Sequence, residues 1–111
     1  MITKTGTTQE QTRVLLENGL KEEYCDVQTT IKLIKETGTE LKILKSVSLA
    51  KLLTLIPNDQ DHKIGISGTD EGGWKITVSS KKDKYRKTVS QDCLVDSGFE
   101  IVLYLLKKKV I

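Results

Sequence analysis

"HKIGISGTDEGGWKITVSSKKDKYRKTVS", residues 62–90, is the stretch that decides the fold class. Its first part contains two short runs in which apolar and polar residues alternate, which is the pattern of a strand with one buried face. The glycine-rich segment "GTDEGG" between the runs is typical of a turn. The runs therefore predict an antiparallel pair of strands whose inner face carries Ile64, Ile66, Trp74, Ile76 and Val78.

A third strand follows in the same stretch. The segment "KYRKTV" places Tyr85 and Val89 in phase, so one face of this segment is apolar as well. Lys82 and Asp83 lie in the short connection before it, where we expect a turn. Together, residues 62–90 predict a three-stranded antiparallel meander with one buried face and an exposed edge strand.

Two helices are predicted before the meander, each from a capping residue that precedes an apolar stripe. The first, in residues 7–20, begins with a Thr-x-x-Glu/Gln capping box, and Gly19 suits its C-terminal end. Two such boxes are available, Thr7 with Glu10 and Thr8 with Gln11. The second, in residues 46–57, begins after Ser48 and ends before Pro57, which cannot continue a helix.

A third helix is predicted from residue 94 to residue 109. Ser90 suits its N-cap, and Asp92 in the first turn would complement the helix dipole. Its apolar residues cover more than one face, and Gly98 leaves a notch where another element could approach. This helix is therefore either central to the fold or also in contact with a partner chain.

Residues 27–44, "VQTTIKLIKETGTELKIL", suit both a hairpin and a helix. The alternation of Val27, Thr29, Ile31 and Leu33 is that of a strand, whereas the spacing of Ile31 and Ile34 also fits a helix. The β-branched residues and the central "ETGTE" favour the hairpin.

The predicted fold is α+β, with one domain over residues 1–111. The three-stranded antiparallel meander, with the hairpin of residues 27–44 as a potential N-terminal extension, packs against about three helices. With 111 residues, 37% of them hydrophobic, the chain is long enough to bury a core without a metal or a disulfide. Aromatic residues make up only 5% of the chain, so we expect an aliphatic core.

The location expected for the chain is the cytoplasm, without membrane contact. We expect no secretory leader, because residues 1–12 contain neither a seven-residue apolar stretch nor a small-residue cleavage site, and the longest apolar run, residues 101–106, is too short to span a bilayer. Cys25 and Cys93 lie 68 positions apart without metal-site spacing, and both are expected to be free thiols.

Catalytic and metal-binding patterns are lacking, so we expect no enzyme and no cofactor. The only histidine, His62, stands near Asp59 and Asp61 after Pro57, where a surface turn is favoured over a site. A zinc site would need further ligands at short spacing. "GISG" is not a nucleophile elbow, and the glycines of "GTDEGG" lack the lysine of a phosphate-binding loop.

The basic segment of residues 79–90 is the one candidate binding site. It holds five cationic side chains against one acid, whereas the other 99 residues hold 13 cations and 14 acids. Contact with nucleic-acid phosphates is one explanation of such a segment, and protection of an exposed edge strand by lysines is the favoured alternative. The candidate contacts are Lys81, Lys82, Lys84, Arg86 and Lys87.

Three further stretches of the chain are "TQEQTRVLLENGL" at residues 8–20, "SVSLAKLLTLIP" at 46–57 and "DCLVDSGFEIVLYLLKKKVI" at 92–111. In this order they resemble small uncharacterised proteins of Bacteroides and related prophages or mobile elements. The chain departs from that family at Ser97 and Gly98, and residues 21–45 have no counterpart in it. The resemblance implies a bacterial or phage accessory protein and carries over no catalytic or binding residue.

These observations favour a non-enzymatic protein that binds an unidentified protein partner. Self-association through the C-terminal helix is expected from the surplus of apolar residues on that helix. The alternative is a small nucleic-acid-binding module that uses the basic segment 81–87.

Overall fold

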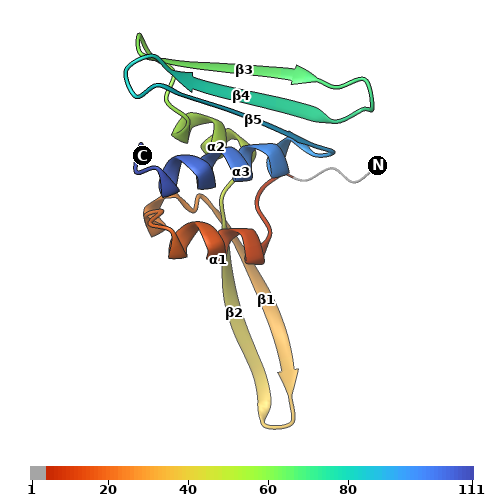
Figure 1. Cartoon of the computed structure of the whole chain (residues 1–111). Coiled ribbons are helices and arrows are strands. Elements are labelled where there is room, and N and C mark those ends of the chain that lie inside the picture. The colour runs from red at the N-terminus through yellow and green to blue at the C-terminus, as the bar shows by residue number, and fades with distance from the viewer. Residues whose placement is uncertain (1–4) are drawn as a thin grey trace.

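The computed structural model describes residues 5–111 and contains two antiparallel sheets and three α-helices within them (Figure 1). A single turn of 3₁₀ helix, Glu22–Tyr24, follows the first helix. The elements in chain order are α1 Gln9–Glu17, β1 Val27–Lys35, β2 Gly38–Ser46, α2 Leu49–Leu55, β3 His62–Gly68, β4 Trp74–Ser80, β5 Tyr85–Gln91 and α3 Leu94–Lys107.

The predicted meander is confirmed. Its strands are ordered β3-β4-β5, and Ile66, Ile76 and Val89 lie opposite one another across the three strands. Ile76 is fully buried, whereas Ile66 and Trp74 remain exposed toward one end of the inner face. The core therefore lies under the middle of the sheet.

Helix α3 lies at the centre of the molecule (Figure 1). It packs against β4, β5, α1 and α2, and α1 lies on the side of α3 that faces away from the sheet. A Cβ atom on Gly98 would lie 3.6 Å from Leu52 Cδ1, so the notch in α3 receives α2. Helix α3 is therefore central to the fold, while Phe99, Leu103 and Tyr104 are only half-buried, and self-association through this helix stays a prediction.

The expected N-cap of α3 is wrong. Ser90 belongs to β5, which continues to Gln91, and the N-cap is Cys93. The acidic residue in the first turn is consequently Asp96 and not Asp92. Ser90 pairs with Lys75 of β4 and is thereby held in the sheet. A residue within a strand is not available to cap the helix that follows.

The other two helices begin where their caps predict. Thr8 and Gln11 form the capping box of α1, and the chain leaves α1 through Gly19 at a φ of +107°. The Ser48 hydroxyl accepts a hydrogen bond from Lys51 N at 3.1 Å at the start of α2. These bonds connect near neighbours in the chain, which is why the sequence alone identified them.

The hairpin of residues 27–44 also forms, but it does not extend the meander. Strands β1 and β2 pair only with each other and project from the body as a separate two-stranded sheet, here called the arm (Figure 1). The arm leaves the helical layer on the side away from β3, β4 and β5, so it cannot reach their edges. It gives the chain its elongated shape of 57 × 32 × 17 Å.

Candidate functional site

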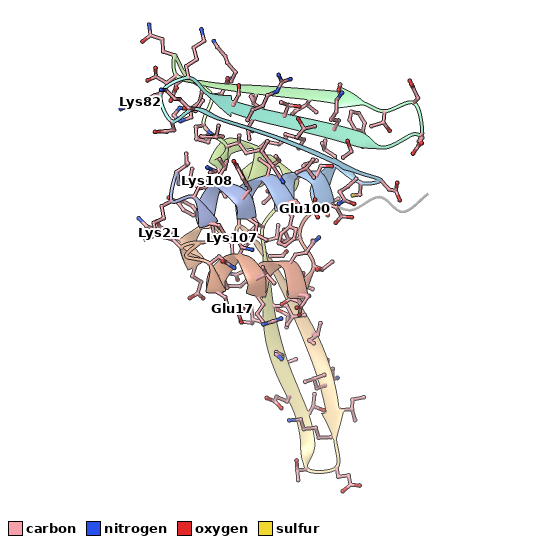
Figure 2. All side chains as sticks on the ribbon, in the orientation of Figure 1. Glu17, Lys21, Lys82, Glu100, Lys107 and Lys108 are labelled. Atoms are coloured by element: carbon pink, nitrogen blue, oxygen red, sulfur yellow. The ribbon has the colours of Figure 1, made fainter. Side chains whose placement is uncertain are left out.

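The five residues of the basic segment do not form one surface. Lys81, Lys82 and Lys84 lie in the turn between β4 and β5, with Lys84 at a positive φ of 54° (Figure 2 shows Lys82 there). Arg86 and Lys87 are neighbours in β5, and successive residues of a strand point to opposite faces. Lys87 accordingly lies on the inner face, with its Nζ 5.5 Å from the centre of the Tyr104 ring.

Arg86 instead joins two cations that the sequence reading missed. The register places Lys63, Ser79 and Arg86 in one row across the sheet, and Ser67, Lys75 and Ser90 in another. The outer face of the meander consists of Lys63, Gly65, Ser67, Lys75, Thr77, Ser79, Arg86, Thr88 and Ser90. The alternation within each predicted strand was a signal that could have separated these residues from the inner face.

This outer face is cationic and rich in hydroxyl groups. None of its nine residues is acidic. Lys63, Lys75 and Arg86 are exposed, and within residues 5–111 no ion pair reaches them. Lysine, arginine, serine and threonine side chains are the groups that commonly bind phosphate oxygens of nucleic acids.

His62 lies between two carboxylates at the end of the meander. Its Nδ1 is 2.9 Å from Asp59 Oδ1, and its Nε2 is 3.8 Å from Asp83 Oδ2. The hydrogen bond from His62, supported by the backbone N–H groups of Asp61 and His62, lowers the pKa of Asp59. Asp59 accepts these two backbone hydrogen bonds at 2.9 Å each. They hold the chain in the surface turn that the sequence predicts before His62.

A cleft of about 390 Å³ adjoins this histidine and is also lined by Asp83, Tyr85, Lys108 and Lys109. The Nδ1 contact with Asp59 orients the ring, whereas the buried Nε2 makes no hydrogen bond within residues 5–111, because its 3.8 Å separation from Asp83 Oδ2 is too long for one. No group of three or more His, Cys, Asp or Glu side chains suited to a metal ion occurs in the described part of the chain.

The two cysteines are far from this cleft and do not pair with each other. Cys25 is buried at the base of the arm, and Cys93 is half-buried before α3. Burial, followed by the nearby Glu22 carboxylate, raises the pKa of the Cys25 thiol. A raised pKa disfavours the thiolate, so Cys25 is a poor nucleophile in this setting.

The arm carries the most exposed aliphatic side chains of residues 5–111. Ile34, Leu41 and Ile43 are 85%, 68% and 60% exposed. The register of β1 with β2 places all three on one face, here called the arm face, together with Gln28, Thr30, Lys32, Thr39 and Lys45. Sequence reasoning identified the hairpin but not this exposure, because no local pattern shows which faces remain uncovered.

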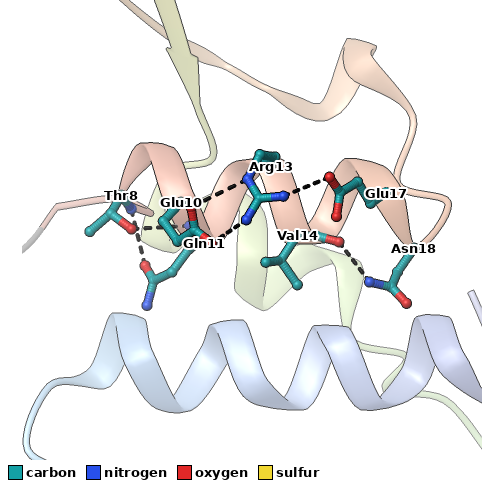
Figure 3. Close-up of polar contacts among 7 residues, drawn as sticks. All are labelled: Thr8, Glu10, Gln11, Arg13, Val14, Glu17 and Asn18. Carbon is teal, nitrogen blue, oxygen red and sulfur yellow. Dashed lines mark hydrogen bonds and ion pairs between the residues drawn. The ribbon is translucent and has the colours of Figure 1, made fainter.

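The arm face continues into a groove of about 600 Å³ between the arm and α1. Leu16 of α1, which is 37% exposed, and Ile43 of β2 both line the groove. Arg13 lies on its rim and is held by Glu10 and Glu17 of the same helix (Figure 3). The exposed aliphatic residues of the arm face therefore extend, through Ile43, into a groove that is otherwise lined mainly by polar side chains.

The base of the arm is tied to the body by polar contacts. Lys45 Nζ lies 2.9 Å from Glu22 Oε1, and Gln9 Nε2 donates to the backbone oxygen of Lys45 at 3.1 Å. Asp26, directly before β1, accepts two hydrogen bonds from Ser48, which follows β2. The arm is thus anchored at its base, and along most of its length no other element of residues 5–111 covers it.

No family model, no curated protein and no solved structure matches the chain. None of the helices in residues 5–111 is long and apolar enough to cross a membrane.

Proposed function

We propose that this protein is a non-enzymatic protein-interaction protein whose contact surface is the arm. The observation that carries the proposal is the exposure of Ile34, Leu41 and Ile43 on one face of a two-stranded sheet. A two-stranded hairpin alone is only marginally stable in water, and strands with a hydrophobic face normally need further strands or a helix against them. Clustered exposed aliphatic residues commonly mark a protein contact.

The unpaired strand edges of the arm support the same function. Beyond their mutual pairing, neither β1 nor β2 is bonded to another strand in the described part of the chain. An open edge presents backbone N–H and C=O groups that another strand can pair with. Lysines at positions 32, 35 and 42 limit unspecific pairing of these edges while leaving the aliphatic residues accessible.

Site-specific photo-cross-linking in the native host tests this function. A benzoylphenylalanine at position 34 or 41 should form covalent adducts with protein after irradiation. The same group at Thr77 on the outer face of the meander is the matched control, because Thr77 lies on a sheet face without aliphatic residues. Absence of adducts at both arm positions would contradict the proposal, whereas the mass of any adduct shows whether the partner is a second copy or another protein.

Nucleic-acid binding is the second candidate function, and the outer face of the meander favours it. Its three cations have no acidic partner among residues 5–111, and the turn residues Lys81, Lys82 and Lys84 stand at one end of the same sheet. Binding to phosphates would weaken with salt, with a slope of about −0.9 per neutralised phosphate in log–log form on duplex DNA.

Fluorescence anisotropy with mixed-sequence DNA and RNA probes tests this candidate. Changing Lys63, Lys75 and Arg86 together to Gln should weaken binding and reduce the salt slope by about three. The matched control changes Lys21, Lys32 and Lys107 to Gln, because it removes the same charge from exposed positions elsewhere. Equal losses in both variants, or no binding by the unaltered protein at low salt, would rule the outer face out.

A further inference from the structure

The free edge of β2 has a defined length and a defined centre. At the base of the arm, the backbone oxygen of Lys45 bonds to Gln9, and the backbone N–H and oxygen of Val47 bond to Thr7. Lys45 and Val47 thus direct their backbone N–H and C=O groups away from β1. Because alternate residues of a strand direct these groups to the same edge, Thr39, Leu41 and Ile43 present theirs to the same open side.

The open stretch therefore runs from Thr39 to Ile43, with Leu41 in the middle. It is bounded by the turn on one side and by the Gln9 side chain on the other. A strand that pairs here must be short, and a strand that runs antiparallel about Leu41 fills the stretch from end to end. Such a strand is available in a second copy of the same chain, because a two-fold axis through Leu41 superposes the open stretch on itself.

The charges of β2 select this register. With the axis at Leu41, Glu40 lies opposite Lys42 of the second copy, and Lys42 lies opposite its Glu40. An axis at Glu40 or at Lys42 would instead place like charges directly opposite each other, which is destabilising. Glu40 also pairs with Lys35 inside the arm, and its two carboxylate oxygens allow it to accept from both lysines.

We propose that two copies of the chain associate through their arms by antiparallel pairing of β2 with β2 about Leu41. This inference rests on the proposed function of the arm as a protein contact and names the partner. The product is a four-stranded sheet in which each open β2 edge is paired and the two Leu41 side chains are adjacent. The arm faces of both copies lie on the same side of this sheet, with α1 of each copy at opposite ends.

The four-stranded sheet relieves two features of the isolated arm, its small number of strands and its open β2 edge, and it leaves the arm faces and the β1 edges open. Three or more strands with a hydrophobic face are stable where two are marginal, and the unpaired edge groups of Thr39, Leu41 and Ile43 obtain partners. The tip of each arm reaches the base of the other copy's β2, where the Gln9 side chain of that copy already occupies the β2 edge at Lys45. The pairing therefore closes as a dimer, because no β2 edge is left for a third copy.

Sedimentation equilibrium of the full chain with charge-reversal variants tests the register. The unaltered protein should be a dimer. Lys42→Glu should weaken the dimer at least tenfold, since it places two acids opposite each other on both sides of the axis. The double variant E40K/K42E should restore dimerisation, because it exchanges the two charges. Lys32→Glu is the matched control, since it makes the same change on β1, away from the pairing edge.

Two results would overturn the proposal. A monomer at all accessible concentrations excludes the second copy as partner, and a dimer that K42E leaves intact excludes this register. Circular dichroism of each variant establishes that the arm remains folded. If the protein is monomeric while arm positions still cross-link to a different protein, only the second copy is excluded and the function of the arm stands. If neither association nor cross-linking is found, the proposed function fails as well.

Discussion

The Asp26 carboxylate accepts the backbone N–H of Ser48 at 2.8 Å and the Ser48 hydroxyl at 2.6 Å. Asp26 stands before β1 and Ser48 after β2, so this one contact closes the base of the arm. The same hydroxyl accepts the N–H of Lys51 and caps α2. The position of the arm and the start of α2 are therefore coupled.

We expect Asp26→Ala to lower the free energy of unfolding by about 1 kcal/mol. It removes two charge-assisted hydrogen bonds, and their contribution is limited because Asp26 is exposed to solvent. Urea unfolding followed by circular dichroism measures the change. Asp70→Ala in the β3–β4 turn is the control and should have little effect, whereas equal losses would show that the contact with Ser48 contributes nothing specific.

Asp26 should also make stability depend on pH. Burial acts to raise its pKa, but the hydrogen bonds from Ser48 outweigh this effect and hold the pKa below the ordinary value of 3.8. A carboxylate with a lowered pKa in the folded state stabilises the fold above its unfolded pKa and loses this contribution as pH falls through the folded value. The unfolding free energy should therefore decline below about pH 4. The decline should be smaller in the D26A variant, and an identical profile would contradict this role.

We expect Gly98→Ala to stabilise the protein by about 0.5 to 1 kcal/mol. Alanine favours the helix over glycine by about this amount, and the added Cβ meets Leu52 at an ordinary contact distance of 3.6 Å. Gly98→Leu should destabilise, because the notch has no room for a larger side chain against Leu52. Gly19→Ala should destabilise as well, since the φ of Gly19 is +107°. Thermal unfolding measures all three, and a destabilised G98A would show that the notch is tighter than its contacts indicate.

Ser97→Ala should lower the free energy of unfolding by about 1 to 2 kcal/mol. The Ser97 side chain is fully buried, and its hydroxyl donates to the backbone oxygen of Trp74 at 2.8 Å. Loss of the donor leaves that carbonyl without this bond between α3 and the sheet. Denaturant unfolding followed by Trp74 fluorescence measures the effect. Ser67→Ala on the exposed outer face is the control, and a loss as large as that of S97A would contradict the prediction.

The two thiols should react at different rates. Cys25 is buried and its pKa is raised, so an alkylating reagent should modify it at least tenfold more slowly than half-buried Cys93. Mass spectrometry of the C25A and C93A variants at neutral pH assigns each rate. Asp26→Ala should accelerate the reaction of Cys25 by loosening the base of the arm, and equal rates in the unaltered chain would show that Cys25 is accessible.

Much of the fold could be predicted because its determinants are local. The alternation in residues 62–90 gave the meander, and the caps at Thr8 and Ser48 located two helices. The "ETGTE" turn favoured the hairpin for the same reason. Each of these patterns involves residues only a few positions apart, whose backbone bonds and side-chain directions follow from the chain itself.

Tertiary structure decided the remaining features, because they depend on residues far apart in the chain. Sheet register joined Arg86 to Lys63 and Lys75 and separated it from Lys87. Pairing with β4 kept Ser90 in β5, so α3 begins at Leu94 without a serine cap. Packing of α3 against β4, β5 and the other helices buried five of its apolar residues, including Ile101 and Leu105, whereas Ile34, Leu41 and Ile43 of the arm were left exposed. Composition and periodicity show which residues are apolar, but only the packing of distant elements determines which of them are removed from water.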